Sequence, residues 1–414
     1  MNYSVIAKKI TLVLFSAQAL GSAGFIAAAT INSNIGADLS GVRALAGLPT
    51  AVYQFGAAFA AYLWGIAFDR LGRRGGLALG MLLGVIGALL AESAVVTRSF
   101  ATLLMAMPLM GAANSALQLG RFAAAEVHPP SERSRAISNV VIGGTFGAIV
   151  GPLMAGLTGQ QAVRFGLSEF AGPYAASAVL FAIGAVIIFA MLKPDPREIG
   201  KAIAALHPAT IAQPEQTRRI RDIFRAPAAF AAMISMVIGQ MVMVMLMVIT
   251  SLHMQDHQHN LTEIGIVISA HTVGMFAFSI FSGRLADRWG RAPVILIGAG
   301  TLILACLSAT LSPDVLPLSF ALLLLGLGWN FCYVGGSSLL ADQLSPDERA
   351  RTQGFNDLLI GLVSAFGGLF SGVIFANIGY TAMGYVGALV AFVPIAMIAW
   401  WKLGQGRVSA TAAR

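Results

Sequence analysis

The sequence predicts an all-α membrane protein with twelve transmembrane helices, arranged as two pseudo-symmetric halves of six helices each. The first supporting observation is composition: hydrophobic residues make up 57% of the 414 residues and charged residues only 11%, against about a quarter in soluble globular proteins. The second is a set of apolar runs long enough to cross the hydrocarbon core, which takes roughly 20 residues in a helix. These runs lie near residues 10–33, 44–68, 76–97, 100–125, 136–157, 172–192, 228–252, 262–282, 293–311, 317–341, 352–376 and 380–401.

An internal repeat is the third observation. Residues 65–74 (GIAFDRLGRR), which we call the signature loop, recur as residues 283–291 (GRLADRWGR), the repeat loop. The segment 130–135 recurs as 346–351, and the two offsets, 218 and 216 residues, are each about half of the chain. We therefore predict a tandem duplication of one membrane-embedded half. Residues 1–193 and 228–414 form the halves, and residues 194–227 form a proline-rich, basic linker that contacts anionic lipid heads.

The signature loop carries a family resemblance. Its pattern G-x-x-x-D-R-x-G-R-[RK], between the second and third spans, resembles the loop signature of the major facilitator superfamily, and the repeat loop is similar to its weaker echo in that family. The resemblance covers the whole chain. It implies a secondary transporter fold, and it is more informative about the fold than about the substrate.

The resemblance also implies a latch between the halves in the outward-open state. In such a latch Asp69 faces the start of span eleven and Arg73 pairs with Glu126, while the repeat uses Asp287 and a pair between Arg291 and Asp342. The remaining members expected in the latch are Gly65, Arg70, Gly72 and Arg288. The alternative is that these charges only orient the loops.

The basic residues predict the orientation of the chain. The formal net charge is +8, but 22 of the 26 Lys and Arg residues fall in loops on the side of the N-terminus, which argues against a nucleic-acid partner. By the positive-inside rule both termini are cytoplasmic, in a bacterial-type inner membrane. The two cysteines, Cys306 and Cys332, lie within spans and offer neither a disulfide framework nor a metal site. We expect no cofactor and no metal.

Polar residues on three spans are candidates for a substrate cavity. Each set has helical spacing that places its members on one face, and a midplane site between repeats requires equivalent polar positions in both halves. The alternative is hydrogen bonding between helices. The candidates are Gln18 and Ser22 in span one, Asn114, Gln118 and Arg121 in span four, and Asn330, Tyr333 and Ser337 in span ten.

Arg121 is the most specific of these candidates. A charge inside a span usually faces the bundle interior or water, and it is a functional candidate by default. Because Arg121 lies about one turn from the cytoplasmic end, snorkelling to the interface or pairing with Glu126 is the alternative.

Span five carries a strip of small residues. Gly143, Gly147 and Gly151 allow close approach of another backbone, and Pro152 removes a helical hydrogen bond. The run resembles the fifth-span motif of drug/proton antiporters in this superfamily, with Ala155 in place of one glycine, which favours export. The arginine that those antiporters carry early in span four is absent here.

Span seven and the residues that titrate complete the candidate site. Span seven holds Gln240 among many methionines, whose flexible thioethers suit varied apolar ligands or simply fill a core. His271 in span eight and Asp357 in span eleven are the candidates for proton coupling, with a structural hydrogen bond as the alternative for His271. The external cluster of three histidines and Asp256 matches no metal signature, so a solvated loop is favoured.

These features favour a monomeric, proton-coupled secondary transporter that works by alternating access and exports a small amphipathic organic compound. The alternative is uptake of a small organic anion or metabolite, which Arg121 favours. A hypothesis of a different class is a transporter-like sensor or scaffold without turnover. An enzyme is not expected, because no phosphate loop, metal-ligand spacing or nucleophile beside a base is present.

Overall fold

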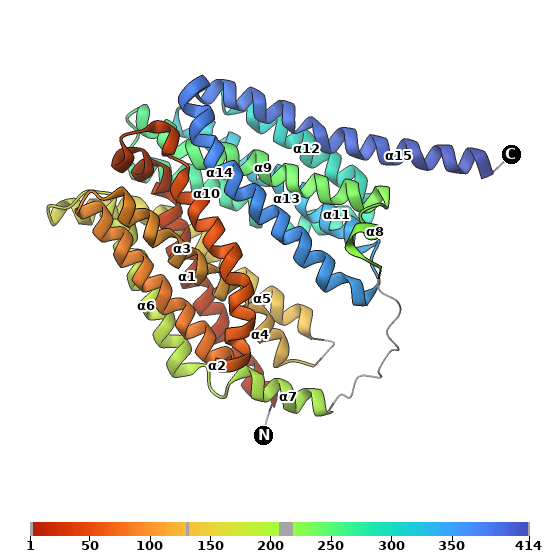
Figure 1. Cartoon of the computed structure of the whole chain (residues 1–414), viewed down its shortest axis with the longest axis horizontal. Coiled ribbons are helices and arrows are strands. Elements are labelled where there is room, and N and C mark those ends of the chain that lie inside the picture. The colour runs from red at the N-terminus through yellow and green to blue at the C-terminus, as the bar shows by residue number, and fades with distance from the viewer. Residues whose placement is uncertain (1–2, 130–131, 207–217, 413–414) are drawn as a thin grey trace. The chain divides into compact units, whose positions relative to one another are not determined.

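A computed structural model describes residues 3–129, 132–206 and 218–412 of the chain, and over these residues it contains helices and no strand. The chain divides into two compact units. Unit 1 comprises residues 1–212 and 258–269, and unit 2 comprises residues 213–257 and 270–414. Each unit is described by itself below (Figure 1). Of the expected linker, residues 207–217 lie outside the described residues.

Within the described ranges, ten helical segments are long and apolar enough to cross a membrane. Two of these segments each consist of two helices joined at a glycine. The backbone leaves the helical region at Gly72, with φ 75°, and at Gly379, with φ 77°. Glycine adopts positive φ without the clash that a Cβ atom would cause, so the chain turns sharply there. Each double segment holds two spans, which gives the twelve spans predicted from the apolar runs. The prediction of an all-α membrane fold is confirmed.

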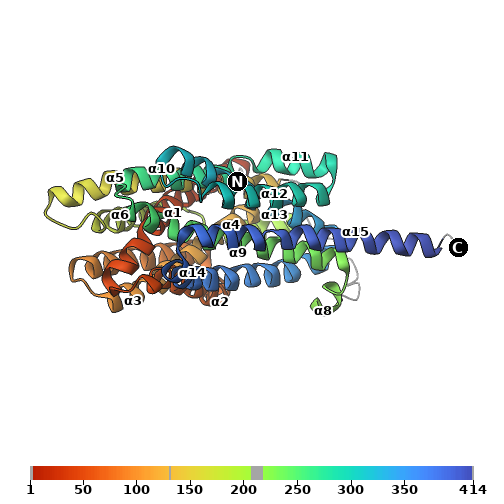
Figure 2. The same cartoon turned by 90° about the horizontal axis from the view of Figure 1, so that it is seen from above.

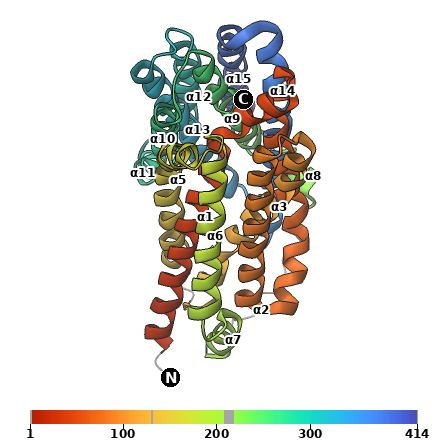
Figure 3. The same cartoon turned by 90° about the vertical axis from the view of Figure 1, so that its left-hand side faces the viewer.

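Unit 1 contains the first six spans. The helices are α1 (Tyr3–Ser40), η1 (Arg43–Leu45), α2 (Leu48–Val96), α3 (Phe100–Gln118), α4 (Gly120–Glu126), α5 (Arg133–Arg164), α6 (Ala171–Met191) and α7 (Pro196–Leu206). The fourth span is shared by α3 and α4, because the helix tightens at Leu119, whose N–H donates to the carbonyl of Ala116 at 3.0 Å. Figure 3 shows α1, α2, α3 and α6 running alongside one another.

Small residues set the packing of α5 against α1. A Cβ atom at Gly143, Gly147 or Gly151 would lie 2.5, 2.0 or 2.5 Å from a backbone oxygen of α1. Because real Cβ contacts are longer than this, only glycine fits at the three positions. The glycine strip of span five therefore lies directly on the backbone of span one.

The first part of α10 (Leu261–Phe276) belongs to unit 1 because it packs on α5. A Cβ atom at Gly265 would lie 2.4 Å from the carbonyl oxygen of Pro152, and one at Gly156 would lie 2.3 Å from the Thr262 hydroxyl. The Ser269 hydroxyl donates to the carbonyl of Ile149 at 2.9 Å.

Unit 2 contains α8 (Ile220–Ile223), α9 (Pro227–Asp256), the second part of α10, α11 (Ser279–Trp289), α12 (Arg291–Ser308), α13 (Val315–Ala341), α14 (Pro346–Val390) and α15 (Phe392–Ala412). The α9 helix is the most buried of the spans and contacts α13, α14 and α15. In Figure 2, α9, α14 and α15 run alongside one another.

The short helix α7 follows span six and packs on α2 and α4. Its apolar side chains Ile199 and Ile203 are buried. Gly200 lies against Glu126, with its ideal Cβ position 3.3 Å from that residue's Cβ atom. The entry to the expected linker is therefore attached to the end of unit 1 that carries the signature loop.

Candidate functional site

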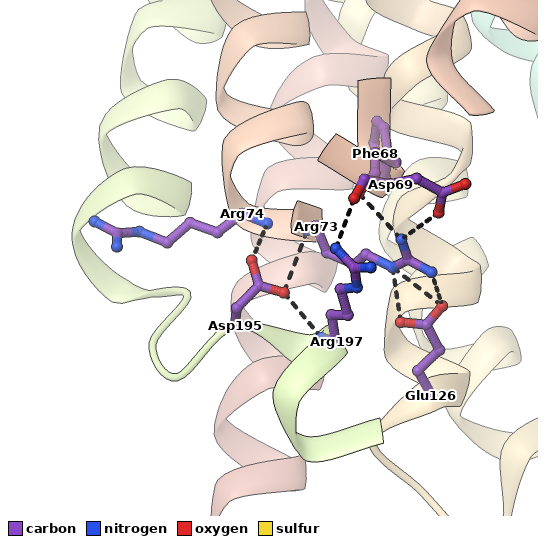
Figure 4. A network of polar contacts seen from close by, with 7 residues as sticks. All are labelled: Phe68, Asp69, Arg73, Arg74, Glu126, Asp195 and Arg197. Carbon is purple, nitrogen blue, oxygen red and sulfur yellow. Dashed lines mark hydrogen bonds and ion pairs between the residues drawn. The ribbon is translucent and has the colours of Figure 1, made fainter. Parts of the chain in front are cut away.

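The signature loop of unit 1 is held by an ion pair between spans (Figure 4). Arg73 donates from Nε to both carboxylate oxygens of Glu126, at 3.1 and 2.9 Å, and from Nη2 to Oε1 at 2.6 Å. Its Nη1 donates to the carbonyl of Phe68 at 3.2 Å and lies 3.6 Å from Asp69. One guanidinium thus joins the end of span two to the end of span four. The Asp69 side chain stays 76% exposed.

Asp195 closes the same network from the segment that follows span six (Figure 4). Its Oδ1 accepts the backbone N–H groups of Arg73 at 3.2 Å and Arg197 at 2.8 Å, and its Oδ2 accepts that of Arg74 at 3.0 Å. These are orphan donors in the first turns of two helices, so one carboxylate caps both span three and α7. Arg197 returns a bond from Nη1 to the carbonyl of Asp69 at 2.6 Å.

Asp195 is not among the residues that the sequence predicts for this site. The order Asp195-Pro196 is typical of a helix N-cap followed by proline at the first helical position, which would predict its cap of α7. Nothing in the local sequence indicates its contact with Arg73, which is 122 residues away.

The repeat loop of unit 2 has the same construction. Arg291 donates from Nε to Asp342 at 3.1 Å and from Nη1 to the carbonyl of Ala286 at 2.7 Å and to Asp287 at 2.8 Å. Gly290 has φ 90°, as Gly72 has φ 75°. The structure therefore contains both ion pairs that the resemblance implied, each between residues of one unit, and the Asp287 side chain is 76% exposed.

A third ion pair stands at the start of span eleven. The Glu348 side chain, 3% exposed, accepts from Nε and Nη2 of Arg218 at 2.9 and 2.7 Å and from its backbone N–H at 2.9 Å. It also accepts the backbone N–H of Ser345 at 3.1 Å, which completes a capping box for α14. The Arg218 guanidinium holds the pKa of the Glu348 carboxyl at about 2. Arg218, the first described residue after residues 207–217, is thus fixed to unit 2.

The cavity candidates in unit 1 differ in their surroundings. Gln18 is buried, donates weakly to the Ser22 hydroxyl at 3.4 Å, and faces Gly144 of α5. Asn114 hydrogen-bonds Tyr53 of α2, whereas Gln118 is exposed.

Arg121 forms no hydrogen bond or ion pair among the described residues. Its Nε is buried and has no partner, and its only charged or aromatic contact is with the ring of its neighbour Phe122, 4.9 Å from the centroid. Glu126, the alternative partner, is occupied by Arg73. Arg121 is therefore a partly buried cation that no described side chain of unit 1 neutralises.

The candidates in unit 2 separate into two groups. Asn330 donates to the carbonyl of Met275 at 2.6 Å and to Ser279 at 2.9 Å and accepts from Ser282, so its amide joins α13 to α10 and α11. Gln240 lies on the other side of α13. There it accepts from the indole of Trp329 at 2.6 Å and donates to Ser364 at 2.8 Å.

Tyr333 and Ser337 follow Trp329 along one face of α13. Tyr333 stacks on Trp329, and the Ser337 hydroxyl contacts the Met236 sulfur at 3.3 Å. Trp329 was not among the sequence-based candidates, because an aromatic residue in a span is ordinarily a lipid or core contact.

His271 is fully buried and joins two helices. Its Nδ1 lies 3.1 Å from the carbonyl of Leu322, which can only accept, so Nδ1 carries the proton. Its Nε2 is buried and has no hydrogen-bond partner among the residues that the structure describes. Asp357 is exposed and accepts from Gln353 one turn away at 3.0 Å.

The histidines near the end of span seven have partners of other kinds. His253 stacks on Tyr380 with ring centroids 4.0 Å apart, and His259 pairs with Glu263 at 3.0 Å. Among the described residues, no group of three His, Cys, Asp or Glu side chains is placed to hold a metal ion.

Residues 12–259 and 232–412 each match the family model described as Major Facilitator Superfamily. YddS of Bacillus subtilis (strain 168), named an uncharacterized MFS-type transporter, is 34% identical over 401 residues, which are 95% of this chain and 91% of that protein. The riboflavin transporter RfnT of Brucella anthropi is 27% identical over 399 residues, 96% and 97% of the two chains. The solved structure of the nucleoside transporter NupG matches with a TM-score of 0.72 at 17% identity, over 96% of this chain and 99% of that one, a likeness of fold alone.

Proposed function

The chain belongs to the major facilitator superfamily and is a multi-pass secondary transporter, and from this premise we propose that it exports a small amphipathic organic compound in exchange for protons. The proposed mechanism is alternating access, in which the two halves rock around a midplane site. The proposed location is a bacterial-type inner membrane with both termini cytoplasmic, because 22 of the 26 basic residues lie on that side. The proposed working unit is the monomer.

The proposed mechanism rests on the ion pairs found in both the signature loop and the repeat loop. Arg73 with Glu126, and Arg291 with Asp342, tie the ends of neighbouring spans within each half. A half held in this way can move as one body. The exposed carboxylates of Asp69 and Asp287 remain available for contacts that form in only one state of the transport cycle.

The amphipathic substrate is supported by the side chains on α9 and α13. The buried Met236 of α9 contacts Ser337, and Gln240 of α9 bonds Trp329, so apolar side chains lie beside a few hydrogen-bonding groups. A relative of 27% identity that is named a riboflavin transporter supports a compound of this size and polarity. The fifth-span resemblance supports export, although the glycines of that motif also have a packing role against α1.

Proton coupling is proposed at His271 and Asp357. In the arrangement described, a proton added to Nε2 of His271 would have no acceptor, because that atom is buried without a partner. Protonation would therefore require α10 to shift against α13, which would link the proton to a conformational change. Asp357 is exposed and accepts a hydrogen bond from Gln353.

The test is transport by purified protein in liposomes. Riboflavin, adenosine and small organic anions are supplied with and without an imposed pH gradient, and wild type is compared with His271→Ala and Asp357→Asn. Movement of an uncharged amphipathic compound against the proton flow supports export. A wild-type transport rate that is the same with and without the imposed pH gradient contradicts proton coupling.

Uptake of a small organic anion is the second candidate, and the unpaired Arg121 favours it. A guanidinium whose buried Nε has no partner among the described residues is stabilised by an anionic ligand. If an anion moves with the protons and Arg121→Ala abolishes this movement while Arg121→Lys retains part of it, uptake replaces export as the proposed function.

The Asp69→Asn variant distinguishes a sensor without turnover from the export and uptake hypotheses. A transporter should lose turnover when this exposed latch carboxylate is neutralised, whereas a sensor should bind its ligand and signal unchanged. No movement of any compound by wild type under any gradient would favour the sensor.

A further inference from the structure

Trp329 and Tyr333 lie on one face of α13, and the contacts of the helix's glycines show which face this is. Gly328 and Gly335 lie against α12, where added Cβ atoms would come 2.8 Å from the backbone of Leu302 and 2.9 Å from the Ile295 side chain. On two other sides of the helix, an added Cβ atom at Gly336 would lie 2.6 Å from the Met236 side chain of α9. One at Gly326 would lie 2.2 Å from the carbonyl oxygen of His271 in α10. At 100° per residue, Trp329 and Tyr333 fall between the α9 and α10 sides, away from α12.

The Trp329 ring is fixed at its polar edge. Its indole N–H donates to Oε1 of Gln240 at 2.6 Å, and the amide of Gln240 is held in turn by Ser364 at 2.8 Å. The Ser364 hydroxyl is anchored to the carbonyl of Ile360 at 2.8 Å. The indole is therefore oriented by three helices, with its only polar atom satisfied by protein, so a ligand does not have to order it.

Aromatic rings extend from this anchor as a stack. Tyr333 lies nearly parallel to Trp329, with centroids 5.0 Å apart and planes 20° apart, and Phe276 meets Trp329 edge-on at 6.2 Å. All three rings are only partly buried, in contrast to the fully buried large side chains of unit 1 such as Phe181. Rigid, partly exposed aromatic rings are strong stacking partners for another flat ring.

An unfilled polar atom lies beyond the end of the stack. Ser337, one turn after Tyr333, contacts the sulfur of Met236, and Asn356 of α14 contacts the same sulfur at 3.7 Å. Oδ1 of Asn356 is buried, and no described residue forms a hydrogen bond with it. The flexible side chain of Met236 therefore contacts both Ser337, one turn after Tyr333, and Asn356, whose Oδ1 lacks a donor among the described residues.

We propose that Trp329 and Tyr333 form a stacking site for a planar heteroaromatic substrate, held in position by Gln240. The ligand ring extends the aromatic stack, and a ring N–H or an amino group attached to the ring donates to Oδ1 of Asn356 when Met236 moves. The proposal deepens the proposed function, on which it rests, by assigning a chemical class to the transported compound.

The test measures binding to purified protein through the quenching of riboflavin fluorescence, with adenosine and ribitol as competitors. Trp329→Leu should weaken riboflavin binding about tenfold or more, the size of stacking effects on flat bases. Trp329→Phe should retain most of the affinity. Trp400→Leu is the matched control, because this tryptophan of α15 is 51% exposed and lies outside the stack. Gln240→Leu should weaken binding less than Trp329→Leu, because the ring remains.

The outcomes separate the stacking site from the transport proposal. If Trp329→Leu binds riboflavin and adenosine as tightly as wild type, or if neither compound binds wild type, the stacking site is wrong, and transport measured in liposomes still decides the function. Equal competition by ribitol, which has no ring, also overturns it. Binding that depends on Trp329, without transport of the bound compound, supports the site and contradicts the proposed export.

Discussion

The carboxylate of Asp195 accepts the backbone N–H of Arg73 at 3.2 Å and thereby caps the helix that begins after the glycine turn of the signature loop. The same carboxylate also bonds the N–H groups of Arg74 and Arg197. The end of span six is therefore attached to the loop that carries the family signature.

Removal of this cap should destabilise unit 1. Asp195→Ala leaves three backbone donors without their acceptor, and loss of one N-cap costs about 0.5 to 2 kcal/mol. We expect a lower thermal unfolding temperature in detergent and reduced transport. Glu198→Ala is the control, because Glu198 is an exposed acid of the first turn of α7. Equal unfolding temperatures for the two variants would contradict the capping role.

Substitution of three loop glycines by alanine should separate backbone strain from crowding. Gly72 has φ 75°, and its added Cβ would lie 2.5 Å from Oδ2 of Asp195. Gly290 has φ 90°, but the nearest atom is 3.9 Å away, and Gly65 has nothing within 4 Å. Positive φ costs a non-glycine residue about 1 to 2 kcal/mol. We therefore expect the loss of stability to follow Gly72→Ala, Gly290→Ala, Gly65→Ala, from largest to smallest.

A double variant tests the steric part. Gly72→Ala combined with Asp195→Ala should be less destabilising than the sum of the single variants, because the clash is then absent. If the losses of stability of the two single variants simply add in the double variant, the methyl group added by Gly72→Ala does not clash with Asp195.

The ion pair of unit 1 should be stronger than its counterpart in unit 2. Arg73 engages Glu126 through three contacts with side chains 20% and 31% exposed, whereas Arg291 reaches Asp342 through one, with 26% and 50% exposed. We expect coupling energies of about 1 kcal/mol for the first pair and less for the second. Double-mutant cycles on unfolding in detergent measure both, and a larger coupling in unit 2 would contradict this ranking.

The twelve spans were predictable because each depends on a local property, an apolar run long enough for the membrane. The pairing of Arg73 with Glu126 was also within reach, since the repeat and the family resemblance both point to it. The break at Gly72 could be expected because the loop must reverse direction within a few residues.

Asp195 and Trp329 were not predictable in the same way. The cap formed by Asp195 depends on where span six ends in space, which no local pattern encodes. The role of Trp329 depends on the rotation of α13 against its neighbours, and that rotation is set by glycine contacts distributed over three helices. Both residues became visible only when distant segments were placed together.

Glu348 should give stability a dependence on pH. Its folded pKa of about 2 lies below the unfolded value of about 4.3, so the carboxylate stabilises the fold above that unfolded value. This contribution is lost as the pH falls towards 2. We expect Glu348→Gln to unfold at a lower temperature than wild type at pH 7, and the difference to shrink between about pH 4.5 and 2.

Two further variants test the cause of this shift. Arg218→Gln removes the main partner of Glu348, so the loss of stability on acidification should begin at higher pH than in wild type. Glu132→Gln is the matched control, because Glu132 occupies the equivalent position in the repeat and is exposed. It should leave the pH profile unchanged. If the difference in unfolding temperature between wild type and Glu348→Gln stays constant with pH, the charge of the carboxylate does not contribute to stability at the start of α14.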